Sequence, residues 1–179
     1  MGEIHAPQPV KLIVSLLGGQ RDLLETAQAR LADRFGVCDY ASAALPFVQT
    51  PYYEAEFGPS LLRRIVAFRR LVDPGELAAI KRLTNDWEQE WSSGGRRQIN
   101  LDPGYVSMAK LVLATTKNFA HRIYIGQGIF AEVTLRYAKG GFQPWPWTYP
   151  DYASEEYRAI FGEIRARYAQ QLRDASGGR

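Results

Sequence analysis

The sequence has few residues of the kinds that build disulfides, zinc sites or membrane spans. Its 179 residues include one cysteine, Cys38, and two histidines. One cysteine excludes a disulfide within the chain and is typical of a reducing compartment. With so few histidines, the chain alone cannot build a Cys/His zinc site. The longest apolar runs are far shorter than the roughly 18 residues that a membrane helix needs.

The first ten residues, MGEIHAPQPV, lack a targeting signal. They have no apolar core of a secretory signal, and Gly2 is not followed by the Ser or Thr that N-myristoylation requires. We therefore expect a cytoplasmic protein with no membrane partner. We also expect residues 1–10 to form a flexible arm, residues 11–172 a single domain, and residues 173–179 a frayed tail.

Known nucleotide and catalytic motifs are missing too. The sequence contains neither a GxxxxGK[ST] phosphate loop nor a GxGxxG fingerprint, and it has no HExxH motif. Gly18-Gly19 lies between an expected strand and an expected helix, where backbone N–H groups can bind an anion, but a plain tight turn is the favoured interpretation of such a pair. The sequence therefore predicts no cofactor, apart from the nucleotide considered below. It leaves open whether the protein is an enzyme.

Hydrophobic residues make up 46% of the chain and charged residues 23%, as in ordinary globular domains. Periodicity predicts strand, helix, strand, strand, helix and strand, then an antiparallel meander and a C-terminal helix. The predicted segments are strand 11–17, helix 23–35, strands 37–47 and 61–71, a helix between 73 and 94, strand 106–116, meander 121–147 and helix 154–172. The first six elements have the βαββαβ order of a ferredoxin-like unit. We therefore expect one α+β domain, with a mostly antiparallel sheet and helices on one face.

Residues 106–116 fit two structures. Their apolar residues favour a strand, but Asp102 could instead cap a helix that runs through Ala109 and Leu113. With the strand, Asp102-Pro103-Gly104 is expected to form the turn that precedes it.

Positive charge is concentrated in residues 94–147. This stretch has seven basic and two acidic residues, a net charge of +5, whereas the whole chain carries +3. It also contains eight of the aromatic residues. Basic groups interleaved with aromatic rings favour anions that carry a flat ring or base. The alternative is a half-buried sheet with a solvated basic face.

The hairpin around Gly126-Gln127-Gly128 sets which side chains share a face. A two-residue loop would mix apolar and polar groups on both faces, whereas a three-residue loop separates them. We therefore predict the three-residue loop. Its pairs are Ile123 with Ala131, Ile125 with Ile129, Tyr124 with Phe130, Arg122 with Glu132 and His121 with Val133. His121 would then lie on the apolar face.

The polar face of this meander is the candidate site. Two arginines flank a carboxylate there, and the arginine fork suits phosphate or carboxylate groups. The alternative is an ordinary cross-strand ion pair. The predicted ligand-binding residues are Arg122, Tyr124, Glu132, Thr134, Arg136, Lys110, Lys117, Trp145 and Trp147.

Several functions fit this face. The first is binding of a small anionic ligand, a nucleotide or a phosphorylated metabolite. The second is a hydrolase or transferase that uses Glu132 or His121 as an acid or base. Binding of RNA, or a structural or assembly role without a small ligand, are further alternatives. The sequence predicts no metal site and does not indicate an oligomeric state.

Four runs resemble the bacterial family called domain of unknown function 4416. They are residues 100–105 (NLDPGY), 110–117 (KLVLATTK), 121–124 (HRIY) and 146–152 (PWTYPDY). The likeness extends over nearly the whole chain and implies a cytoplasmic bacterial protein of one domain. It implies no activity and no catalytic residues. Members are sometimes labelled as GTP-binding, a label for which this sequence has no phosphate loop.

Overall fold

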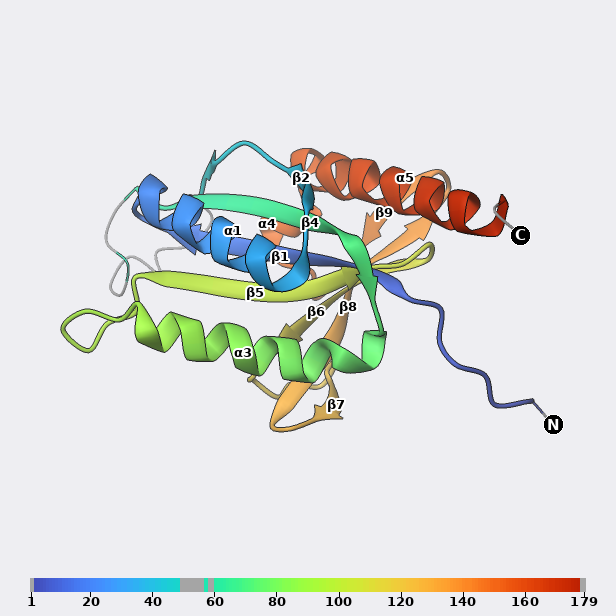
Figure 1. Cartoon of the computed structure of the whole chain (residues 1–179), viewed down its shortest axis with the longest axis horizontal. Coiled ribbons are helices and arrows are strands. Elements are labelled where there is room, and N and C mark those ends of the chain that lie inside the picture. The colour runs from blue at the N-terminus through green and yellow to red at the C-terminus, as the bar shows by residue number, and fades with distance from the viewer. Residues whose placement is uncertain (1, 49–56, 58–59, 178–179) are drawn as a thin grey trace.

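A single antiparallel sheet organises the chain (Figure 1). The structure is a computed structural model that describes residues 2–48, 57 and 60–177. The strand order is β2-β4-β1-β5-β6-β8-β7, with β3 paired to β4 and β9 paired to β8. The strands are β1 (Val10–Gly18), β2 (Cys38–Ala41), β3 (Leu45–Pro46), β4 (Leu62–Val72), β5 (Ile99–Val106), β6 (Lys110–Thr115), β7 (Ile123–Gly126), β8 (Ile129–Ala138) and β9 (Gly141–Pro144). The predicted α+β class with a mostly antiparallel sheet is therefore confirmed.

The described helices are α1 (Arg21–Phe35), α3 (Leu77–Glu90), α4 (Pro150–Ala153) and α5 (Glu155–Gly177), with a short 3-10 turn η2 (Pro74–Glu76) before α3. The predicted start of α3 is confirmed, because the Asp73 side chain accepts a hydrogen bond from the backbone N–H of Gly75 at 2.7 Å. Residues 37–47, expected as one strand, form β2 and the separate short strand β3.

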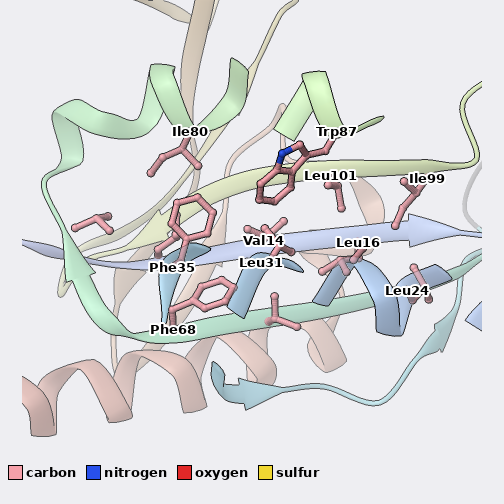
Figure 2. Packing of buried hydrophobic residues seen from close by; sticks show 14 of the residues in the cluster. Val14, Leu16, Leu24, Leu31, Phe35, Phe68, Ile80, Trp87, Ile99 and Leu101 are labelled. Carbon is pink, nitrogen blue, oxygen red and sulfur yellow. The ribbon is translucent and has the colours of Figure 1, made fainter. Parts of the chain in front are cut away.

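Helices cover both faces of the sheet, so the prediction that they lie on one face is wrong. Val14 and Leu16 of β1 point towards α1 and α3, together with Phe35 and Trp87 (Figure 2). Ile13, the residue before Val14, points to the opposite face and belongs to a second core cluster formed with α4 and α5. The physical reason is that β1 is apolar on both sides, and each side must be shielded from water.

The sheet opens between β5 and β6. Asp102-Pro103-Gly104, expected to be a turn, lies inside β5 and pairs with β1. The expected strand at 106–116 is confirmed as β6, and residues 107–109 form the turn that joins it to β5. The pairing of β5 with β6 covers Gly104 to Val106, the second half of β5. Beyond Gly104, β6 and β8 turn away from the direction of β5 (Figure 1).

The second core cluster yields a prediction about alkaline pH. Burial raises the pKa of Tyr157 from 10.0 to about 12, and Arg63 partly offsets this rise. In the unfolded chain the phenol loses its proton near its ordinary pKa, so rising pH favours unfolding between these two values. Because of Tyr157, the free energy of unfolding should fall by up to about 1.4 kcal/mol per pH unit in this range. We expect Tyr157→Phe to remove this part of the fall. Urea unfolding at pH 9, 10 and 11 checks it, and equal slopes in both proteins would contradict it.

Candidate functional site

A cavity of about 780 Å³ lies where β5 and β6 separate. We call it the charged cleft. Five cationic and four carboxylate side chains line it, and they come from distant parts of the chain. The cations are Arg63, Lys81, Arg97, Lys117 and Arg122, and the carboxylates are Glu88, Asp102, Glu132 and Asp151.

One wall of the charged cleft, which we call the inner wall, is formed by Lys81 and Glu88 of α3. It takes the place of a neighbouring strand for the first half of β5. The Nζ of Lys81 donates to the carbonyl of Leu101 at 2.8 Å and to the Asp102 carboxylate at 3.0 Å. Glu88 accepts from the backbone N–H of Leu101 at 2.7 Å and from Arg97 at 2.7 Å. Because buried backbone groups need partners, these side chains of α3 satisfy the strand edge that the opening exposes. Lys81 and Glu88 therefore complete the hydrogen bonding of this strand edge.

Two neighbouring carboxyl groups in the charged cleft have pKa values that are shifted in opposite directions. Burial raises the pKa of Glu88, although Lys81 offsets part of the rise. Burial also acts to raise the pKa of Asp102, but the attraction of Lys81 and Arg63 outweighs it and leaves this pKa lowered. Neighbouring carboxyl groups whose pKa values are separated in this way are a feature of acid–base sites. The cleft thus holds one carboxyl group whose pKa is raised beside one whose pKa is lowered.

Arg63 lies deep in the cleft. Its side chain is 6% exposed and forms a buried ion pair with Asp151. The guanidinium carbon is 4.4 Å from the ring centre of Phe47 and 5.5 Å from that of Tyr152. Within the described part of the chain, the Nε of Arg63 has no hydrogen-bond partner. A buried donor without an acceptor is rare in folded proteins and costs free energy.

Another wall of the charged cleft, which we call the outer wall, is formed by Arg122 and Glu132. It contains part of the predicted site. Arg122 donates from Nε to Glu132 at 2.8 Å, from NH1 to the carbonyl of Lys117 at 3.0 Å, and from NH2 to the hydroxyl of Tyr149 at 3.0 Å. Thr134, fully buried, donates to the other oxygen of Glu132 at 3.3 Å. The predicted grouping of Arg122, Glu132 and Thr134 therefore exists in the structure. Arg122 is held rigidly by three acceptors.

The register of the β7–β8 hairpin agrees with the prediction over two pairs. Ile123 pairs with Ala131, and Tyr124 pairs with Phe130. A shift in register then replaces the predicted pairing of Ile125. The Tyr124 ring packs against Phe130 and does not line the cleft.

His121 was predicted on the apolar face, and this is wrong. Its Nε2 lies 3.1 Å from the same oxygen of Glu132 that Arg122 contacts. The reason is that β7 begins at Ile123, so His121 lies in the preceding turn and strand alternation does not set its direction.

Arg136 and the tryptophans do not line the cleft. The guanidinium of Arg136 lies over Trp145 at 4.7 Å, and Trp145 stacks on Trp147 at 5.1 Å. Trp147 in turn stacks on His121 at 5.2 Å. Both indole rings are therefore already stacked on neighbouring side chains, whereas they were predicted to bind a ligand. Lys110 lies opposite Arg136, at the far end of β6 from the cleft.

The sequence reasoning missed the inner wall. Arg63 was not among the predicted site residues, yet it is buried among rings. Lys81 and Glu88 are seven positions apart on α3, and both are almost fully buried on its apolar side. A charged pair at this helical spacing among core residues was the signal that could have identified them.

Fold and site together define an α+β protein with a charged cleft between separating strands. The chain matches the family described as Domain of unknown function (DUF4416) over residues 8–168, and it belongs to that family. No curated protein and no solved structure matches it. No described helix is both long and apolar enough to span a bilayer. Across residues 2–48, 57 and 60–177, no group of three His, Cys, Asp or Glu side chains is placed to hold a metal.

Proposed function

We propose that this protein binds a small anionic ligand, a nucleotide or a phosphorylated metabolite, in the charged cleft. The observation that carries the proposal is the cavity of about 780 Å³ with five cations and four carboxylates in its lining. Its volume lies within the roughly 300–1,000 Å³ that is usual for small-molecule sites. The lining has one more cation than carboxylates, so an anionic ligand suits it better than a cationic one.

The role of Glu132 in this site is to hold Arg122 and His121. Both of its oxygens accept hydrogen bonds, and its side chain is 3% exposed. A carboxylate engaged in this way is a poor general base, because the proton it would accept must compete with those contacts. The geometry therefore supports binding better than an enzyme based on Glu132.

We also propose that β1, α1, β2, β4, α3 and β5 form a ferredoxin-like unit to which the meander is added. The strand order β2-β4-β1-β5, antiparallel throughout, and the shared face of α1 and α3 support this reading. A cytoplasmic location is likewise proposed, and the free, half-buried Cys38 supports it.

The lysines at the two ends of β6 test the proposed function. We expect Lys117→Ala to weaken binding of a phosphorylated ligand about tenfold, because Lys117 lines the cleft. Lys110→Ala removes the same charge outside the cleft and should change affinity little. A thermal-shift screen of nucleotides and sugar phosphates identifies a ligand, and calorimetry then gives the affinities.

Two results would contradict the proposal. One is equal weakening by both lysine variants, since this would indicate a diffuse charge effect. The other is the absence of any stabilising phosphorylated compound. Binding of RNA that falls steeply as salt rises, without any response to small phosphates, would instead support the RNA alternative.

A further inference from the structure

The burial of Arg63 narrows the chemical class of the ligand. Its side chain is 6% exposed, whereas Lys117, in the same lining, is an exposed residue. The cleft therefore presents a cation at its floor and another at its mouth, from β4 and from the segment after β6. A single oxyanion would contact one of them and leave most of a cavity of about 780 Å³ unfilled.

The chemistry at the floor suits an oxyanion. Arg63 already donates from NH1 to Asp151, and its Nε is a buried donor without a partner among the described residues. The Nε–H and a terminal N–H of a guanidinium form a fork that matches two oxygens of a phosphate or carboxylate. The rings of Phe47 and Tyr152 beside it lower the local dielectric, and this strengthens such a contact.

The neutral part of the lining combines hydrogen-bonding groups with rings and aliphatic side chains. Five amide and hydroxyl side chains, of a kind that binds hydroxyls, belong to it: Asn85, Gln89, Asn100, Thr115 and Thr116. Its rings are already engaged, because Phe47 and Tyr152 lie beside Arg63 and the Tyr149 hydroxyl accepts a hydrogen bond from Arg122. The tryptophans expected to stack on a base lie outside the lining. A hydroxyl-rich body therefore fits this space better than a nucleobase.

We propose that the cleft binds a sugar or polyol that carries an oxyanion at each end, with one end on Arg63 and the other on Lys117. This inference rests on the proposed function and narrows its ligand class. Arg63 is then the specificity-determining group, because it distinguishes a ligand with two oxyanions from a ligand with one. Arg122, held by Glu132, belongs to the same lining.

The test compares matched pairs of probes. The probes are the bisphosphates of fructose, glucose, ribulose and glycerate, each with its own monophosphate. We expect at least one bisphosphate to bind the wild-type protein about tenfold tighter than its monophosphate. The double variant Arg63→Gln/Asp151→Asn replaces the buried ion pair by two neutral side chains. These can still hydrogen-bond to each other, and no unpaired charge is left buried. It should abolish the bisphosphate advantage, so that each bisphosphate binds no tighter than its own monophosphate.

Arg63→Lys is the second variant, and it keeps the test valid if the double variant fails to fold. Lysine retains the charge beside Asp151 but lacks the forked N–H groups, so most of the bisphosphate advantage should still be lost. Equal affinities for bisphosphates and monophosphates in the wild type would overturn this inference while leaving the proposed function intact. The same holds if the advantage survives in both variants. Failure of every phosphorylated probe to bind would overturn both proposals.

Discussion

Replacing Gly104 by alanine should lower the free energy of unfolding by about 3 kcal/mol, a large effect for adding one methyl group. A Cβ at this position would lie 2.3 Å from the carbonyl oxygen of Val112 and 2.7 Å from Cδ2 of Leu113. The first of these contacts is with backbone of the paired strand β6, which cannot move aside without breaking the pairing that remains between β5 and β6. Glycine is needed here for close approach of two strands.

Gly141→Ala is the matched control for this substitution. Gly141 also lies in a strand, β9, and its added Cβ would meet only the amide nitrogen of Gln143, at 3.9 Å. Urea unfolding followed by circular dichroism should show a much lower midpoint for Gly104→Ala than for Gly141→Ala. Similar midpoints would contradict this prediction. They would mean that the close approach of β5 and β6 at Gly104 does not contribute to the free energy of unfolding.

Replacing Glu88 by alanine should also cost about 3 kcal/mol, because it breaks a buried network of charges. The variant leaves the backbone N–H of Leu101 without the acceptor it now has at 2.7 Å. It also removes the carboxylate that faces Arg97 at 2.7 Å and Lys81 at 3.9 Å. Glu88→Gln should lose less, since its amide oxygen can still accept from Leu101.

The control for Glu88 lies on the same helix. Asp86 is exposed, and Asp86→Ala removes the same charge from α3 without touching β5. Thermal and urea unfolding at neutral pH should place the variants in the order Asp86→Ala, Glu88→Gln, Glu88→Ala, from most to least stable. If Glu88→Ala were as stable as Asp86→Ala, the first half of β5 would not depend on α3 for its hydrogen bonds.

Sequence patterns correctly predicted the features that depend on residues close together in the chain. The cap at Asp73 began η2 and α3 as expected, because a cap depends on the few residues that follow it. The pairing of Ile123 with Ala131 followed from a short loop and from the need to separate apolar from polar groups. His121 escaped this reasoning because it lies outside β7.

Non-local pairing explains the other errors. Asp102-Pro103-Gly104 has the composition of a turn, but pairing with β1 holds it extended. The two-sided apolar character of β1 was visible in the sequence, and cover on both faces follows from it, yet which helix takes which face depends on packing.

The amino-acid sequence by itself determined the α+β class, the helix starts, the core stripes and the grouping of Arg122 with Glu132. Tertiary structure alone decided that this pair forms one wall of a cleft whose other walls carry Arg63, Lys81 and Glu88. The physical reason is one of range. Caps, periodicity and hairpin register act over a few residues, whereas the cleft exists because β5 and β6 meet closely at Gly104 and then diverge, which brings together side chains far apart in the chain.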